Sequence, residues 1–156
     1  PETLFAFNDF VIARKEAIRM IRIRVEVDDD FLQTYTADGL IIASPTGSTA
    51  YSLSSNGPIL TPALEALIIN PICPHVLTMR PLVISSRHRV RVELEPVCHA
   101  QFSADGMIEA DLRYRQPVII READRRVRLI RLKKRSFFEI LRTKLNWGED
   151  IRNVPK

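Results

Sequence analysis

Alternation of apolar and charged residues is the feature of this sequence that most restricts its fold. Residues 21–28 read IRIRVEVD, with Ile or Val at every second position and a charged residue after each. Successive side chains of a strand point to opposite faces, so this period of two predicts a strand with one apolar and one solvated face. Residues 31–36 resume an extended pattern after three aspartates, and the two segments together predict a hairpin.

Several later segments repeat the strand pattern. Residues 40–43 (LIIA) are apolar on both faces and precede Ser44-Pro45, which predicts a buried strand that ends there. We therefore expect a mainly β protein, an antiparallel β-sandwich-like domain with a few short helices. The other predicted strands are residues 82–84, 89–94, 118–120 and 127–132, with a bulge at Leu129-Ile130.

Helical patterns are confined to two segments. Residues 62–67 (PALEAL) combine Pro near a helix start with good helix formers. Ser136 predicts the N-cap of a C-terminal helix, with Glu139 at its third position and Gly148 beyond its end. No Gly- or Ser-rich linker interrupts the chain, so we expect one domain over residues 1–148 and a polar tail over residues 149–156. The predicted apolar face of the C-terminal helix is Phe137, Ile140, Leu141 and Leu145.

Length and composition restrict the class of protein. The 156 residues are 46% hydrophobic and 27% charged, which is typical of a soluble globular protein with a core of its own. No stretch approaches the ~20 apolar residues of a membrane span, and the first residues do not resemble a secretory signal. Two cysteines are too few for a disulfide scaffold. We expect a cytoplasmic protein with no membrane partner.

The net charge of +4 comes from one block of the sequence. Ten of the 23 Lys and Arg lie in residues 113–135, where Glu122 and Asp124 are the only acidic residues. Such a block can bind nucleic acid or phosphate. Residues 126–129 also alternate Arg with Val and Leu, as a half-buried strand with a solvated face does, and aromatic interleaving is lacking. We predict no nucleic-acid partner; the alternative is a basic β-domain that binds RNA or another anionic partner.

Residues 44–54 (SPTGSTAYSLS) place six Ser and Thr hydroxyls and one glycine directly after the buried strand. Gly47 permits a left-handed turn or a close approach of two backbones. Thr46, Ser48 or Thr49 can cap a helix that begins near Ala50, whose free N–H groups would face an anion or a polar ligand. Ser and Thr also favour caps and turns in any protein, so binding and purely structural interpretations are both open.

Other chemical motifs are missing from the sequence. It contains no G-x-x-x-x-G-K-[ST], no G-x-G-x-x-G and no G-x-S-x-G. Cys73-Pro74-His75 and Cys98-His99 lack the paired spacing of a zinc site, so we predict no metal site in this chain.

Several segments together resemble the NAD kinase family. The likeness covers almost the whole chain and is strongest at the family's core motif, which residues 38–42 and 44–54 match nearly letter for letter. It implies the C-terminal domain of the family, a β-sandwich-like domain that carries most of the dinucleotide site. The segments are residues 8–12 (NDFVI), 38–42 (DGLII), 44–54 (SPTGSTAYSLS), 71–75 (PICPH), 80–84 (RPLVI) and 144–148 (KLNWG).

The resemblance implies transfer of the γ-phosphoryl group of ATP to the 2′-hydroxyl of the adenosine ribose of NAD, giving NADP. It also implies Mg²⁺ or another divalent metal and a homodimer or homotetramer. Asn8 and Asp9 would contact the dinucleotide near its ribose, with Asp9 in a supporting role. Asp38 would bind toward the nicotinamide end, across a subunit boundary. The implied binding residues are Asn8, Asp9, Arg19, Thr36, Asp38, Thr46, Thr49, Ala50, Tyr51, Ser52, Leu53 and Ser54.

The sequence departs from the family in two places. It contains no GGDGT motif, whose Asp serves the family as catalytic base in an N-terminal α/β domain. We therefore expect the NAD-binding part of a longer enzyme, with weak NAD or NADP binding and little or no kinase activity by itself. Residues 104–107 read ADGM where many relatives have Asp-Gly-Gln, and Met107 cannot make the amide contacts of Gln. The resemblance leaves open a polyphosphate donor, use of NADH, and a related lipid or sugar kinase.

Overall fold

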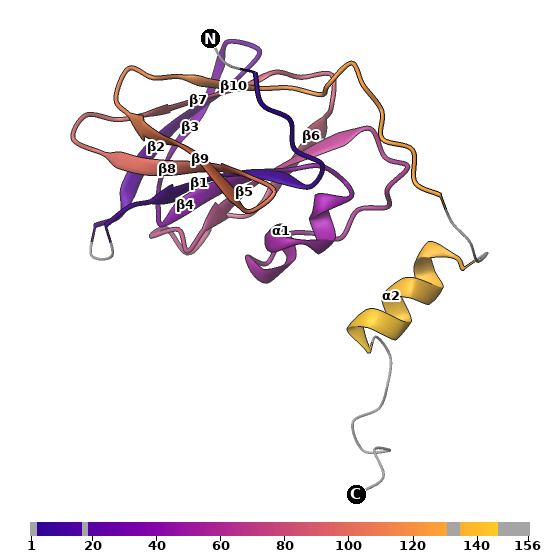
Figure 1. Cartoon of the computed structure of the whole chain (residues 1–156). Helices are drawn as coiled ribbons and strands as arrows, with labels where there is room; N and C mark the ends of the chain where they lie inside the picture. Colours follow the sequence, from indigo (N-terminus) through magenta and orange to yellow (C-terminus); the bar gives the residue numbers. More distant parts are fainter. Residues whose placement is uncertain (1–2, 17–18, 131–134, 147–156) are drawn as a thin grey trace, which may run out of the picture. The chain divides into compact units, whose positions relative to one another are not determined.

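Two antiparallel sheets make up most of the structure (Figure 1). The computed structural model describes residues 3–16, 19–130 and 135–146. The chain divides into two units, Pro1–Arg125, which holds both sheets, and Arg126–Lys156, which holds one helix. The predicted mainly β, antiparallel sandwich-like fold is confirmed.

The larger sheet has six strands in the order β6-β5-β4-β1-β8-β9, so β1 and β4 lie at its centre. The smaller sheet has four strands in the order β10-β7-β2-β3, and every pairing in both sheets is antiparallel. The strands of the larger sheet are β1 (Asp9–Arg14), β4 (Gly39–Ala43), β5 (Ala66–Ile72), β6 (Leu82–Ser85), β8 (His99–Ala104) and β9 (Met107–Arg113). Those of the smaller sheet are β2 (Ile21–Val27), β3 (Asp30–Ala37), β7 (Val90–Leu94) and β10 (Val118–Ile120).

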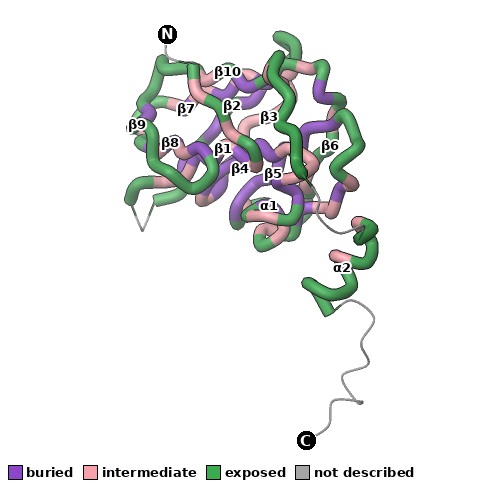
Figure 2. The backbone as a smooth tube through the Cα atoms, turned by 45° about the vertical axis from the view of Figure 1, so that its right-hand side comes forward, coloured by how far each residue is buried: buried purple, intermediate pink, exposed green. Residues whose placement is uncertain are grey.

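The core lies between the sheets, where Figure 2 shows buried backbone on the facing strands. The alternation that predicted β2 acts here as expected, because Ile21, Ile23 and Val25 turn inward and are at most 3% exposed. They pack in one cluster with Leu40 and Phe102 of the other sheet. Burial of such side chains is the main stabilising contribution to the sandwich.

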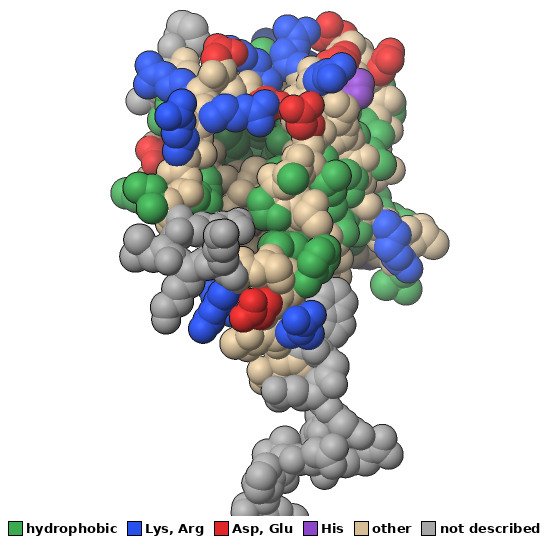
Figure 3. Space-filling view, turned by 90° about the vertical axis from the view of Figure 1, so that its right-hand side faces the viewer, with side chains coloured by type: hydrophobic (Ala, Val, Ile, Leu, Met, Phe, Trp, Pro, Cys, Tyr) green, Lys and Arg blue, Asp and Glu red, His purple; other side chains and the backbone are tan. Residues whose placement is uncertain are grey.

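The outward face of the smaller sheet carries paired charges. Glu26 accepts hydrogen bonds from Arg24 at 2.8 Å and Arg91 at 3.0 Å, and Arg91 also binds Glu93 at 2.9 Å. Hydrogen bonds from Arg24 and then from Arg91 lower the pKa of Glu26. Figure 3 shows basic and acidic side chains side by side at the upper end of another face of the molecule. Solvated pairs contribute little to stability, so these charges keep the face polar rather than hold the sheet together.

The second face of the larger sheet is also covered over its central strands. Val11, Ile41 and Ile68 form a further apolar cluster with Leu60, which follows the short 3-10 helix η1 (Gly47–Thr49) and the helix α1 (Tyr51–Ser54). All residues of β4 and β5 are buried. The apolar character of both faces of residues 40–43 therefore reflects a central strand covered on both sides.

The predicted helix at residues 62–67 is wrong. Leu64 N–H donates to the Thr61 carbonyl at 3.1 Å in a single turn, and β5 then begins at Ala66. Residues 66–72 bond to β4 on one side and β6 on the other. Pairing on both edges and burial of the whole strand outweigh the helix propensity of a six-residue segment.

The predicted strand at residues 127–132 is wrong over its described part, and so is the bulge at Leu129-Ile130. Val127, Leu129 and Ile130 are 65%, 62% and 89% exposed and belong to no strand, whereas residues 131 and 132 lie outside the described residues. Alternation favours a strand only where a neighbouring strand is available, and this segment pairs with none among the described residues.

The C-terminal helix α2 (Phe137–Leu145) begins as predicted. Ser136 Oγ accepts the Glu139 N–H at 3.1 Å, and Leu141 of the predicted apolar face is buried. The helix ends at Asn146 in the left-handed conformation, with φ of 49°, which is the role expected of Gly148. Trp147, Gly148 and the predicted tail 149–156 lie outside the described residues.

We expect Ile23→Ala to lower the free energy of unfolding by about 2–5 kcal/mol, because Ile23 is fully buried between the sheets. Ile119→Ala is the matched control, since Ile119 lies on β10 with 56% of its surface exposed, and it should change stability by less than about 1 kcal/mol. Urea unfolding measures both. Equal losses from the two variants would contradict the position of the core.

Candidate functional site

The segment after β4 folds back over the first residues of β1. Asp9 pairs with Ala43, so both neighbours of that pair, Asn8 and Ser44, leave the sheet together. Ser44 N–H donates to the Asn8 carbonyl at 2.8 Å, and Ser44 Oγ donates to the Phe7 carbonyl at 2.8 Å. A Cβ on Gly47 would overlap the Asn8 carbonyl, which explains the glycine by close approach rather than by a left-handed turn.

The hydroxyls of this loop close it instead of capping a helix. Ser48 Oγ donates to the Pro45 carbonyl at 2.6 Å and accepts the Leu60 N–H at 3.0 Å, while Thr49 Oγ1 donates to the Thr46 carbonyl at 3.2 Å. Neither η1 nor α1 has a side-chain cap, so the predicted capping by Thr46, Ser48 or Thr49 is wrong. A Ser or Thr hydroxyl can donate to a carbonyl three residues earlier as well as cap a helix N-terminus, and in this tight loop Ser48 and Thr49 donate to such carbonyls. A helix does begin beside Ala50, as expected.

Asn70 supports α1 through hydrogen bonds from β5, a role that the sequence patterns above did not predict. It is fully buried in β5, and its side-chain nitrogen donates to the Ser52 carbonyl at 3.0 Å, to Ser52 Oγ at 3.1 Å and to the Ser55 carbonyl at 3.3 Å. Gly57 packs tightly against the same atoms. An amide inside the apolar run of residues 66–72 was the available signal, because buried polar groups need partners.

Asp9 is a buried carboxylate at the centre of the site. Only 5% of its surface is exposed, and it accepts a hydrogen bond from the Tyr51 N–H. Burial raises the pKa of Asp9 above its usual range, the charge of Asp105 raises it further, and the bond from Tyr51 acts in the opposite direction. This contact ties the first turn of α1 to β1.

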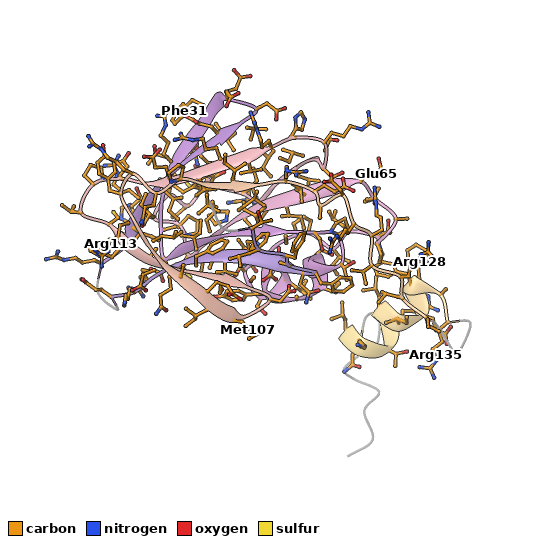
Figure 4. The ribbon with its side chains drawn as sticks, turned by 45° about the horizontal axis from the view of Figure 1, so that its top comes forward. Phe31, Glu65, Met107, Arg113, Arg128 and Arg135 are labelled. Carbon is orange, nitrogen blue, oxygen red and sulfur yellow. The ribbon has the colours of Figure 1, made fainter. Side chains whose placement is uncertain are left out.

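Asp105 comes to the same place from the β8–β9 turn. Its carboxylate accepts the N–H groups of Phe7 at 2.7 Å, Asn8 at 2.6 Å and Asp9 at 3.2 Å. Met107 follows two residues later, 71% exposed, at one end of β9, with Arg113 at the other (Figure 4). In the sequence, residues 104–107 stood out because Met107 replaces the Gln of many relatives. In the structure, the Asp105 carboxylate of this segment makes the contacts to residues 7–9.

Polar groups remain open at this end of β1. Within the described part of the chain, the side chains of Asn8, Thr46, Tyr51 and Ser54 have no hydrogen-bond partner. Tyr51 is 46% exposed, and Ser54 lies one turn further along the same helix face. An amide, hydroxyls and an exposed ring can bind a ligand that combines hydroxyls with a flat base.

The structure therefore brings most of the predicted residues together in one group, which we call the first group. Within it, Ser52 faces the interior and Leu53 is half-buried, whereas Thr49, Tyr51 and Ser54 are exposed. The first group comprises Asn8, Asp9, Thr46, Thr49, Ala50, Tyr51, Ser52, Leu53 and Ser54.

The remaining predicted residues, Arg19, Thr36 and Asp38, form a second group at the opposite end of the central strands. Asp38 precedes β4 and pairs with Arg14, the last residue of β1, with Nε and Oδ1 3.1 Å apart. Arg19 lies just before β2, whose Ile21 pairs with Ala37. At about 3.4 Å per residue, the length of β1 separates the two groups by roughly 17 Å.

No three His, Cys, Asp or Glu side chains of residues 3–16, 19–130 and 135–146 lie close enough together to hold a metal ion. Over the same ranges, no helix is long and apolar enough to cross a membrane.

Fold and site together define a two-layer antiparallel β-sandwich domain that presents a polar surface beside its central strand. The sequence model described as "ATP-NAD kinase C-terminal domain" matches residues 7–132, and the chain belongs to this family. The chain is 46% identical over 143 residues to the NAD kinase of Geotalea daltonii. The aligned segment covers 91% of this chain and 50% of that protein. The chain thus spans about half the length of the curated relatives it matches.

Two solved structures are similar to the fold. The yeast NADH kinase complexed with NADH superposes with a TM-score of 0.79 and 27% identity, covering 96% of this chain and 44% of that one. An NAD kinase from Archaeoglobus fulgidus in complex with ATP superposes with a TM-score of 0.63 and 27% identity, covering 76% of this chain and 49% of that one.

We expect Gly47→Ala to lower the free energy of unfolding by about 1–3 kcal/mol, because the added methyl group overlaps the Asn8 carbonyl. Denaturant unfolding and amide exchange at Ser44 would measure the loss. Thr49→Ala is the control in the same loop and should cost less than about 1.5 kcal/mol, the value of one exposed hydrogen bond. Unchanged stability of the Gly47→Ala variant would contradict the close approach.

Asp9→Asn should become more stable relative to the wild type as the pH rises above 3.8, the ordinary pKa of Asp. A carboxyl whose pKa is raised by folding contributes stability at low pH and loses it as the pH passes through the folded value. Thermal melting from about pH 3 to pH 7 measures the trend.

Asp28→Asn is the control with the opposite sign. The Arg89 N–H and then His88 lower the pKa of Asp28, so its contribution is present above 3.8 and lost toward acid. Asp28→Asn should therefore be most destabilising at neutral pH. Parallel trends for the two variants would contradict the burial of Asp9.

Proposed function

We propose that this chain is the dinucleotide-binding part of an NAD kinase, which transfers the γ-phosphoryl group of ATP to the 2′-hydroxyl of the adenosine ribose of NAD and forms NADP. The observation that carries the proposal is the loop of residues 44–54, folded onto Asn8 and Asp9 within the segment that the family model matches. Relatives named NAD kinase, a neighbour complexed with NADH and a neighbour in complex with ATP support it.

The first group supplies the pocket in this proposal. The Asn8 amide and the hydroxyls of Thr46 and Ser54 hydrogen-bond ribose and base edges, and the exposed ring of Tyr51 stacks on a base. Thr49, Ala50 and Leu53 line the pocket, and Ser52 holds the helix through Asn70. Asp9 supports the site by accepting the Tyr51 N–H.

The second group serves the pocket of another copy in a homodimer or homotetramer. Its roughly 17 Å separation from the first group along β1 supports a shared site, because Asp38 and Tyr51 of one chain lie at opposite ends of the central strands. An apolar surface at the sheet edge is available for such a contact. Leu82 and Val83 of the edge strand β6 are 37% and 42% exposed, and Leu77, which precedes β6, is 88% exposed.

Phosphoryl transfer depends on positioning and on neutralising charge around the phosphates. Mg²⁺ or another divalent metal supplies that neutralisation when bound. Among the described residues no cluster fits such an ion, so we assign no metal ligand to this chain. The sequence contains no GGDGT motif, and we likewise assign the catalytic base to no residue of this chain.

We also propose a cytoplasmic location and no nucleic-acid partner. The free thiols Cys73 and Cys98 support a reducing compartment. Ion pairs support the absence of a nucleic-acid partner, because acidic side chains neutralise part of the basic block of residues 113–135. Arg121 binds Asp124 at 3.3 Å, and Arg135 lies 3.9 Å from Glu139.

We expect Tyr51→Ala and Asp38→Ala each to weaken NAD binding by about tenfold, the value of a lost stacking or charged contact. An equal mixture of the two variants should regain the wild-type affinity at about a quarter of its sites, because random pairing of subunits restores one complete site in each mixed dimer. Titration calorimetry measures affinity and stoichiometry, and sedimentation gives the oligomeric state.

Tyr114→Ala and Asp111→Ala are the matched controls. Tyr114 is exposed to a similar extent as Tyr51, at 44%, and Asp111 pairs with Lys15 as Asp38 pairs with Arg14. Neither control should alter NAD binding. Binding to a random oligonucleotide with a steep salt dependence, in place of NAD, would favour the basic-domain alternative. If the mixture does not regain NAD-binding sites, only the sharing of the site between subunits is contradicted, and the proposal that the chain binds NAD stands.

A further inference from the structure

The turn between β8 and β9 is joined to the start of β1 by hydrogen bonds in both directions, and no binding role given above uses it. The Asp105 carboxylate accepts three successive backbone amides, those of Phe7, Asn8 and Asp9. In return, Asp105 N–H donates to the Asp9 carbonyl at 3.0 Å. Consecutive N–H groups that converge in this way form a concave anion site, and here the anion is a side chain of the protein.

The same peptide groups are held from the opposite side by the loop after β4. Ser44 binds the carbonyls of Phe7 and Asn8, whereas Asp105 binds the amides of Phe7, Asn8 and Asp9. Since the Asn8 side chain has no hydrogen-bond partner among the described residues, its direction is set by this backbone. Displacement of the turn would therefore move the Asn8 amide and the Asp9 carboxylate together.

We propose that Asp105 is a positioning residue of the dinucleotide site, which acts through the backbone of residues 7–9 to fix the Asn8 amide and the Asp9 carboxylate. The turn adopts a conformation suited to this task, with φ of 48° at Asp105 and 83° at Gly106. Asp tolerates the left-handed region better than most residues, and Gly adopts it freely. The inference rests on the proposed function, because it requires that residues 8 and 9 bind the dinucleotide.

A turn that belongs to neither proposed binding group offers a direct comparison within the chain. Asp28 lies in the β2–β3 turn with φ of 50°, and its carboxylate accepts the Arg89 N–H at 2.8 Å. It makes the same kind of contact as Asp105, from another hairpin and in the other sheet. Loss of either carboxylate removes a charged acceptor from backbone amides, but only Asp105 is bonded to residues 7–9.

The experiment compares NAD affinity and stability for the wild type, Asp105→Asn and Asp28→Asn by titration calorimetry and urea unfolding. Asn keeps the size of the side chain but replaces one acceptor oxygen by an amide NH2 group, which cannot accept from an N–H donor, and removes the charge. Both variants should lose stability. Asp105→Asn should weaken NAD binding by about tenfold or more, and Asp28→Asn by less than about twofold.

Titration of Asp9, followed by NMR, separates positioning from general destabilisation. Because the charge of Asp105 raises the pKa of Asp9, Asp105→Asn should move that titration toward acid, whereas Asp28→Asn should leave it in place. Wild-type Phe7 and Asn8 amide protons should also be protected from exchange. Exchange at the rate of an open coil would overturn the proposal even if Asp105→Asn does not fold.

The possible results distinguish the two proposals. A wild-type chain that does not bind NAD overturns the proposed function and this inference with it. A wild-type chain that binds NAD, with Asp105→Asn no weaker than Asp28→Asn, overturns only the positioning role of Asp105.

Discussion

The antiparallel pairing of β1 with both β4 and β8 is the constraint on which the site depends. β1 is hydrogen-bonded along both edges, so the segment that leaves β4 and the turn that leaves β8 reach its first residue from opposite sides. Asp9 pairs with Ala43, and Phe10 pairs with Ala104. The registers of these two ladders bring Ser44 and Asp105, far apart in the sequence, onto the same peptide groups.

Around that point the polar groups fall into two kinds. Ser44, Ser48 and Asn70 satisfy backbone groups of the loop and of α1; Ser48 and Asn70 are fully buried, and Ser44 is partly buried. Tyr51 and Ser54 lie on the outer side of the same short helix and remain open. A buried polar group without a partner is costly, so the first kind is committed to the fold, and the second is available to a ligand.

Much of the architecture followed from residue patterns. The alternation of residues 21–28 predicted β2, the doubly apolar residues 40–43 predicted a central strand, and Ser136 predicted the start of α2. The same reasoning failed at residues 62–67 and 127–130, where propensity and alternation favoured elements that the chain does not form. A local pattern gives a preference of a fraction of a kcal/mol per residue. Pairing with two neighbouring strands outweighs it at residues 66–72, whereas residues 127–130 pair with no strand among the described residues.

The sequence by itself determined the family, the mainly β class and the loop that carries the polar residues, because strand alternation and the run of residues 44–54 are local features. Only the tertiary structure decided how those residues are divided. It placed Asp38 and Tyr51 at opposite ends of the central strands, turned Ser52 inward, and set Asp105 against the amides of residues 7–9. Contacts between residues nearly a hundred positions apart depend on strand order and register, which no local pattern specifies.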